Sequence, residues 1–513
     1  MTPGMQVRLW FRAATQGERR TTILVTAAVA GLLLGSLVIR PDDAKTTVAT
    51  RQAAGTQGRA AGTAGGSGIA TDGGISGTDV GGAGSFAGGA GGTGGTSGGN
   101  TSGGDTGGGG GGPVTLTASD RGVSQTEIKI GFLVANVGGL DGAGFALDIR
   151  EDTPEYAQAL ADHVNNTGGL QGRNVTVAVR KTDPTSQSDQ AAACEAMVSD
   201  AQVFGVVDVG ALADTPAFDC LATENQTPYI HNTIWGTDWL ARSGGMEVGY
   251  PAAIDRIIQT WTRDLQAIGW FEGNPTVGIV GDKCVATKPM IDNVFKPALE
   301  QAGAGKVVIA EHDCDLQSVA SQPPSFVPQF RTAGVTKVLF VANFVTVTVF
   351  MKTAESQLWR PQYSVSDWWQ LTQDTSAKNY DPNQFDGAIA ITSNGLLLPQ
   401  SGVDPYAGAQ LCSQIAVDAG LPALEFTTRN AELWAMCDNF LLMIDGIKGA
   451  GANPTRVAWA QAIQQLPTRS SVVFGPATFG PNKTTGSDQV FTAQWQRACT
   501  CFKKVSDFRP AAA

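Results

Sequence analysis

Histidine, cysteine and serine are the side chains that most often carry catalysis or bind metal, and in this 513-residue chain their spacing fits neither role. Only three histidines occur, His163, His231 and His312, and no CxxC or HExxH pattern is present. Residues 95–99 match the GxSxG pattern of serine hydrolases, but no strand precedes them, as a nucleophile elbow requires. We therefore predict no catalytic residue, no metal and no cofactor, and we do not expect an enzyme.

Polar and aromatic side chains gather in loops that directly follow predicted strands. These loops are residues 135–139, 210–215, 231–236, 343–345 and 367–369. In open α/β sheets the ligand lies beyond the carboxyl ends of the strands, because loop amides and helix N-termini point there. The candidate ligand-binding residues in these loops are Asn136, Ala211, Asp214, Thr215, His231, Thr233, Trp235, Asn343, Phe344, Asp367 and Trp368.

Several of these residues have a structural explanation as well as a functional one. Trp235, Trp239, Trp368 and Trp369 could stack on a flat or sugar-like ligand face or pack in the core. Asp367 could contact a ligand or cap a helix, and His231 could be a hydrogen-bonded loop histidine. Asp208, inside an apolar strand, is costly to bury alone, so we expect it to bond backbone or a neighbouring loop.

The elements that must position these loops alternate between strand and helix, which is typical of parallel sheets covered by helices on both faces. The pattern runs through one set of strands and then starts again, so we predict an α/β fold with two doubly wound parallel-sheet lobes. The predicted strands are 128–134, 175–179, 204–209, 229–230, 277–280, 307–310, 338–341, 363–366, 388–392, 472–474 and 490–495. The predicted helices are 154–166, 187–199, one beginning near 216, 253–268, 289–301, 327–332, 347–357, 405–419, 431–447 and 456–466.

The first 122 residues are predicted to lie outside these lobes. Four arginines precede an uncharged apolar run at 23–39, which is long enough to cross a bilayer. Basic residues stay cytoplasmic, so a single-pass protein of the cell membrane with its bulk outside the cytoplasm is expected; a cleaved signal peptide is the alternative. We predict a cytoplasmic segment at 1–20, a transmembrane anchor at 21–40 and a Gly-rich flexible linker at 41–122.

Eight cysteines in an exported chain are expected to form disulfides. Cys194 and Cys220 lie in successive helical segments, Cys284 and Cys314 each follow a strand, and Cys412 and Cys437 lie in consecutive helices. Cys499 and Cys501 are bonded either to each other or elsewhere. The formal net charge is −11, with no basic block after the first twenty residues, so nucleic-acid binding is not expected.

An ordered series of short motifs resembles the type I periplasmic binding proteins, and most closely the branched-chain amino-acid binding branch that serves ABC importers. The motifs are residues 128–133, 165–173, 183–184, 277–282, 386–388 and 474–476. The resemblance covers about residues 126–505. It implies two lobes joined by three crossovers, at 123–249 with 391–470 and at 250–390 with 471–505.

The resemblance also implies roles for some candidate residues. Asp367 matches the acid that holds the ligand ammonium in the amino-acid binders, and Phe344 matches an aromatic that covers the ligand. Ala211 and Trp235 fall where hydroxyl residues are expected, although a small offset brings in Asp214, Thr215 or Thr233.

The expected function is capture of a small polar ligand, an amino acid or related compound, between two lobes. The expected partners are this ligand, an ABC permease, and the membrane through the N-terminal helix. The alternative is a membrane-tethered sensor or scaffold of the same fold that acts through a protein partner.

Overall fold

The computed structural model describes residues 114–142, 145, 149–212, 215–233, 235–395 and 408–512. All of the described residues belong to one compact unit. The predicted cytoplasmic segment, the transmembrane anchor at 21–40 and the linker up to residue 113 lie outside the described residues. Within the described part of the chain, no helix combines the length and the apolar character that a membrane crossing requires.

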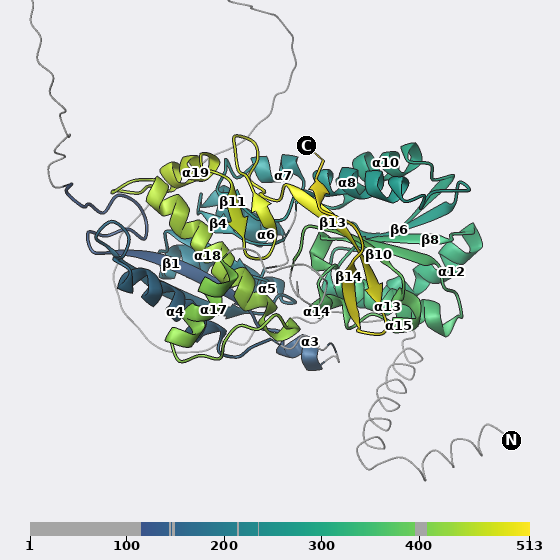
Figure 1. Ribbon diagram of the computed structural model, residues 1–513, viewed down its shortest axis with the longest axis horizontal. Coiled ribbons are helices and arrows are strands. Elements are labelled where there is room, and N and C mark those ends of the chain that lie inside the picture. The colour runs from purple at the N-terminus through teal and green to yellow at the C-terminus, as the bar shows by residue number, and fades with distance from the viewer. Residues whose placement is uncertain are drawn as a thin grey trace, which may run out of the picture. The chain divides into compact units, whose positions relative to one another are not determined.

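The first lobe is built on a five-stranded parallel sheet with the strand order β2-β1-β3-β4-β5 (Figure 1). Its central strand β1, Glu127–Ala135, is buried along nearly all its length, as expected when helices cover both faces. The neighbouring strands are β2 (Asn174–Thr182), β3 (Gly205–Val209), β4 (Tyr229–Ile230) and β5 (Glu247–Val248).

Helices from two distant parts of the sequence cover this sheet. In α4, Thr153–Asn166, the stripe of Tyr156, Leu160 and Val164 is buried, and the late helix α18, Ala431–Gly449, packs against both α4 and β3. Figure 1 shows these late helices in yellow-green among the blue elements of the first lobe. The other helices of this lobe are α3 (Gly138–Gly142), α5 (Gln187–Glu195), η1 (Ala196–Asp200), α6 (Thr215–Phe218), η2 (Asp219–Glu224), α7 (Thr237–Ala241), α17 (Ala409–Asp418), η5 (Thr428–Asn430) and α19 (Arg456–Gln464).

The second lobe has an eight-stranded mixed sheet, which differs from the predicted parallel one. Five strands run parallel in the order β10-β9-β8-β6-β7, and β13, Gln489–Gln496, joins β10 antiparallel. Strands β14 and β15 also pair with β13 antiparallel, and a short turn joins β13 to β14. The strands are β6 (Thr276–Asp282), β7 (Lys306–His312), β8 (Lys337–Val341), β9 (Gln362–Ser366), β10 (Ile389–Thr392), β14 (Cys501–Lys504) and β15 (Arg509–Pro510).

Helices that precede or follow the parallel strands cover the second sheet. The longest are α8, Ile254–Ala267, which buries an apolar stripe that includes Trp261 and Leu265, and α13, Phe344–Ser356. The remaining helices are α9 (Lys288–Met290), η3 (Ile291–Phe295), α10 (Lys296–Gln301), α11 (Leu316–Ser321), α12 (Pro323–Ala333), η4 (Trp368–Gln370), α14 (Asp374–Ala377) and α15 (Pro382–Phe385).

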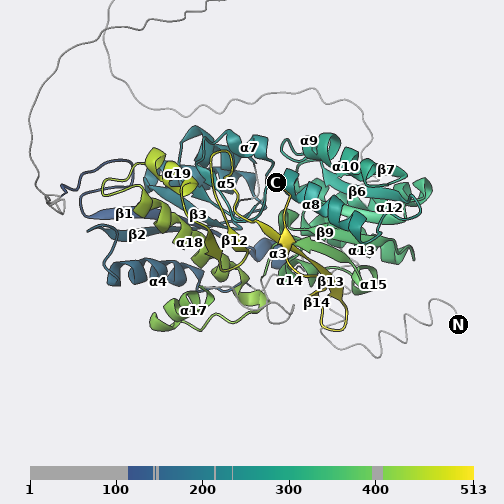
Figure 2. The same cartoon turned by 45° about the horizontal axis from the view of Figure 1, so that its top comes forward.

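The chain passes between the two lobes near residue 250 and again after β10. Strand β10 ends at Thr392, so the return to the first lobe lies just beyond the predicted boundary at 391. The late chain then runs from β11 and β12 beside the first lobe into β13 of the second sheet, as Figures 1 and 2 show. The Gly249 N–H donates to the Thr484 carbonyl at 3.0 Å and the Ser487 N–H donates to the Tyr250 carbonyl at 2.7 Å. The connecting segment near residue 250 is therefore hydrogen-bonded to the connecting segment at 484–487.

Residues 114–122 were assigned to the flexible linker, but they lie against the first lobe. The Thr117 N–H donates to Asn453 Oδ1 at 2.9 Å, and Arg173 donates to the Thr117 carbonyl at 2.9 Å. The carboxylate of Asp120 pairs with Arg456 at 3.0 Å. This stretch therefore belongs to the first lobe, because its backbone and charge find partners there.

The predicted strand at 472–474 is wrong. These apolar residues form the turn of a hairpin between β11 (Arg469–Ser471) and β12 (Gly475–Ala477). They are buried there, and the Asp438 carboxylate accepts the N–H of Val472 at 2.9 Å. A buried turn and a buried strand give the same short apolar run in the sequence.

Candidate functional site

A cavity of about 290 Å³ opens where the carboxyl ends of the strands of both sheets meet. Its wall receives residues from the loops that follow β1, β2, β3 and β4 in the first lobe and β6, β7, β8 and β9 in the second. This is the position that the strand-end rule predicts for a ligand. The volume lies near the lower end of the range of small-molecule pockets, about 300–1,000 Å³.

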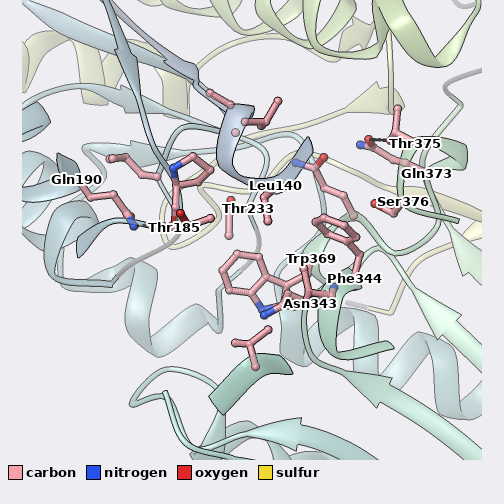
Figure 3. Close-up of a pocket in the computed structure, with 18 of the residues that line it drawn as sticks. Leu140, Thr185, Gln190, Thr233, Asn343, Phe344, Trp369, Gln373, Thr375 and Ser376 are labelled. Carbon is pink, nitrogen blue, oxygen red and sulfur yellow. Dashed lines mark hydrogen bonds between the residues drawn. The ribbon is translucent and has the colours of Figure 1, made fainter. Parts of the chain in front are cut away.

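The wall is mainly apolar, with polar groups at particular places. Figure 3 shows Trp369 and Phe344 in the middle of the pocket, with Thr185 and Gln190 on one side and Gln373, Thr375 and Ser376 on the other. The apolar wall residues include Ala135, Val137, Leu140, Ile149, Leu212, Val319, Phe344, Val345 and Trp369.

The central aromatic residues are held by other aromatic rings. Trp369 meets Trp235 edge-on at 5.9 Å between ring centroids, and Phe344 meets Phe145 edge-on at 5.5 Å. Each of these contacts joins a first-lobe residue to a second-lobe residue. Trp369 and the following Gln370 have φ angles of 48° and 56°, a backbone conformation that is unfavourable for residues other than glycine.

Thr233, Asn343 and Phe344 are the candidate ligand-binding residues that the structure places on the wall. Asn343 caps α13, since its Oδ1 accepts the N–H groups of Val345 at 3.0 Å and Thr346 at 3.1 Å. The cap fixes the start of the helix, and Phe344 is its first residue.

The structure places most of the other candidates away from the wall. His231 is buried, with Nε2 at 2.9 Å from a Glu247 carboxylate oxygen and Nδ1 accepting the Thr233 N–H at 3.2 Å. Ala211, Trp235 and Trp368 are also buried and pack in the core. Asn136 is exposed beside the cavity. Asp214 lies outside the described residues. Thr215 is the first residue of α6, and the structure does not describe its side chain.

Asp367, matched above to an ammonium-binding acid, is occupied by other protein groups. One carboxylate oxygen accepts the hydroxyls of Thr372, at 2.5 Å, and Thr392; the other accepts the N–H and the hydroxyl of Ser393, each at 2.7 Å. The side chain is buried, and burial raises its pKa above the usual range for aspartate. Asp367 thus ties the loop after β9 to the end of β10.

Glu432 and Arg429 are wall residues that the sequence analysis missed. They lie at and just before the start of α18, far along the chain from the strand-end loops. The only sequence signal was the predicted helix at 431–447, which gave no reason to place its first turn in the cleft. Thr185 and Gln190 were missed in a similar way, although they follow β2 as the strand-end rule requires.

The Glu432 carboxylate accepts no hydrogen bond from a described residue, and its Oε2 is fully shielded from solvent. Burial, and then repulsion by Asp208, raise its pKa from 4.5 to about 8. Asp208 itself is buried and accepts the Ala211 N–H at 2.8 Å and the Tyr229 hydroxyl at 2.5 Å. The prediction that Asp208 bonds backbone or a neighbouring group is confirmed.

All eight cysteines are paired, which confirms the predicted disulfides. The pairs are Cys194–Cys220, Cys284–Cys314, Cys412–Cys437 and Cys499–Cys501, so the CxC cysteines bond to each other. Cys284 and Cys314 follow β6 and β7, and both lie on the cavity wall. Among the described residues, no cluster of three or more histidine, cysteine or acidic side chains could hold a metal ion.

Comparison with known proteins gives a family match and a set of similar folds. The family described as "Periplasmic binding protein" matches residues 127–500. None of the curated proteins compared with the chain matches it.

Solved structures of ABC transporter binding proteins share the fold at low sequence identity. A fatty acid ABC transporter substrate-binding protein from Thermomonospora curvata has a TM-score of 0.57 at 13% identity, covering 77% of this chain and 95% of its own. A branched chain amino acid ABC transporter from Thermus thermophilus with bound valine gives 0.55 at 13%, covering 75% and 98%. A solute-binding protein from R. palustris in complex with 4-hydroxybenzoate gives 0.57 at 14%, covering 75% and 98%.

Proposed function

The chain belongs to the periplasmic binding protein family, and on this premise we propose that it captures a small ligand outside the cytoplasm and delivers it to an ABC importer. The observation that carries the proposal is a cavity of about 290 Å³ whose wall takes residues from the strand ends of both sheets. A wall drawn from both lobes suits a ligand that is enclosed between them.

The proposed ligand is largely apolar. Aromatic and aliphatic side chains form most of the wall, and burying such surface is worth about 25 cal/mol per Å². Asp367, the acid expected to hold an amino-acid ammonium, has both oxygens engaged by Thr372, Thr392 and Ser393. An α-amino acid held in the way that the sequence implied is therefore not part of the proposal.

The proposed setting is the outer face of the cell membrane. The apolar run at 23–39 would anchor the chain, and the Gly-rich stretch that follows would let the two lobes reach a permease. Four disulfides fit an oxidising compartment. Solute binding, without catalysis, is the activity that we propose.

The experiment is a ligand screen on the full-length chain, with thermal unfolding as the readout and native mass spectrometry to detect retained compounds. Fatty acids, hydroxybenzoates, amino acids, amines and sugars form the panel. A true ligand at 100 times its Kd adds about 2.7 kcal/mol of stability, so a saturable rise in Tm is expected. Co-purification of a permease and an ATPase from membranes checks the delivery step.

A matched pair of variants tests whether the cavity is the binding site. Leu140→Trp fills part of the wall and is expected to abolish the rise in Tm, because Leu140 lines the cavity. Leu411→Trp adds the same ring at an exposed site on α17 away from the cavity and is expected to keep it. If no compound raises Tm and none is retained, the proposed function is wrong.

A further inference from the structure

The acidic side chains on the cavity wall differ in what they bond. Asp315 caps α11. Its carboxylate accepts two hydrogen bonds from Ser318, one from the N–H at 2.9 Å and one from the hydroxyl at 2.6 Å. Asp282 accepts the N–H of Cys284 at 3.0 Å. Glu432 accepts no hydrogen bond from any described residue. Of these three wall carboxylates, Glu432 is thus the one that the fold leaves for another donor.

The surroundings of Glu432 are short of positive charge. The side chain is half-buried in the first turn of α18 and lies near Asp208, which is buried behind the wall. Arg429, on the same rim, is exposed and forms no ion pair with the described residues. Two carboxyl groups that are close together and out of water are costly to ionise without a cation.

The shielded oxygen of Glu432 can reach the cavity at small cost. The last torsion of a glutamate side chain is broad and nearly two-fold, so the two carboxylate oxygens exchange places easily. The neighbouring residue on the wall is Gly210, whose missing side chain leaves room beside Glu432 Oε1.

Aromatic faces and an apolar wall complete the site. Trp369 and Phe344 lie in the middle of the cavity (Figure 3), and such rings attract cations over their faces. The aliphatic wall residues would surround an apolar group. The described wall thus combines one unbonded carboxylate, aromatic rings and a hydrophobic enclosure.

We infer that the ligand carries an amine on an apolar body, and that Glu432 of the first lobe receives the amine nitrogen. This inference rests on the proposed function and deepens it. An ammonium group donates a charge-assisted hydrogen bond to Glu432 and offsets the repulsion between Glu432 and Asp208. The apolar body fills the space between Leu140, Val345 and Trp369.

The experiment compares three probes that share one apolar body: 2-phenylethylamine, 2-phenylethanol and 3-phenylpropanoate. Titration calorimetry on the full-length chain is done at pH 8.5, which is above the Glu432 pKa of about 8 and below that of an alkyl amine, roughly 10. The amine is expected to bind about tenfold or more tightly than the alcohol, the usual gain from a hydrogen bond between charged groups. The carboxylate is expected to bind more weakly than either.

Two variants assign the preference to one residue. Glu432→Gln keeps the shape of the side chain and removes its charge, so the amine is expected to lose its advantage over the alcohol. Glu425→Gln, an exposed residue of the preceding loop away from the wall, is expected to leave the preference unchanged. The thermal unfolding of each variant without ligand shows that it is folded.

Three results overturn the inference. Tightest binding of the carboxylate would assign the site to an anion held by Arg429, and the proposed function would stand. An amine preference that survives in Glu432→Gln would place the nitrogen elsewhere. If none of the probes binds while another compound of the screen does, the ligand class is wrong; if nothing binds at all, the proposed function fails too.

Discussion

At the scale of single residues, two acidic side chains differ in whether the fold supplies their hydrogen bonds. Asp367 is buried and both of its oxygens accept hydrogen bonds from Thr372, Thr392 and Ser393. Glu432 is half-buried on the cavity wall and accepts none from the described residues. The first acid stabilises the loop after β9, and the second is free for a ligand. A carboxylate at a strand end is therefore not by itself a ligand contact.

The substitution Asp367→Asn is expected to destabilise the protein by about 2–4 kcal/mol. The asparagine side chain has only one acceptor oxygen, and its NH₂ group would face the hydroxyl and N–H groups that now donate to Asp367. Buried polar groups would then be left without a hydrogen-bond partner. Urea unfolding measures the change. Asp200→Asn, at an exposed position where no described residue donates to the carboxylate, is the control and is expected to stay within about 0.5 kcal/mol. A variant of unchanged stability that had lost ligand binding would show that Asp367 contacts the ligand.

At the scale of elements, the cavity depends on how the strand-end loops are fixed. Asn343 caps α13 through the N–H groups of Val345 and Thr346. The Cys284–Cys314 disulfide joins the loops after β6 and β7 where they form the wall. These local bonds hold the wall in place before a ligand arrives, which lowers the entropy cost of binding.

Replacing Cys284 and Cys314 by alanine is expected to cost about 3–4 kcal/mol, the loop-entropy value for a separation of 30 residues. Replacing Cys499 and Cys501, whose separation is 2 residues, is expected to cost much less, because so short a loop restricts the unfolded chain little. Denaturant midpoints of the two double variants provide the comparison. Equal losses in both would mean that loop closure does not set the contribution of these disulfides.

At the scale of the whole molecule, the cavity exists because the connecting segments hold the carboxyl ends of the two sheets towards each other. Tyr250, in the first connection, is fully buried, stacks on Phe474 at 6.4 Å and meets Phe479 at 6.0 Å. Its hydroxyl accepts a hydrogen bond from Arg469, and Ser487 donates to its carbonyl. The Tyr250 side chain thus packs residues 469–479 of the late chain against the first connection, and its backbone carbonyl adds Ser487.

The variant Tyr250→Ala is expected to lose about 3–5 kcal/mol of stability and to become sensitive to proteolysis near residues 249–254, since a large ring leaves the packing between the connections. Tyr250→Phe keeps the ring and is expected to lose only about 1 kcal/mol, the value of one hydrogen bond. Urea unfolding and limited proteolysis provide the measurements. Similar losses in the two variants would show that the hydroxyl, and not the ring, holds the connections.

The sequence by itself determined the alternation of strands and helices, the strand ends as the place of the cavity, and the disulfide pairs other than Cys499–Cys501. These features depend on apolar periodicity and on the polarity of loops that follow strands, which are local properties. Thr233, Asn343 and Phe344 were reached in this way and lie on the wall.

Only the tertiary structure decided which of the other side chains face the cavity. Asp367 turns towards Ser393, and His231 turns towards Glu247. Glu432 reaches the wall because the chain returns to the first lobe after β10 and lays α18 against β3. The direction of a side chain and the meeting of segments more than 200 residues apart depend on packing between elements, and local periodicity does not record them.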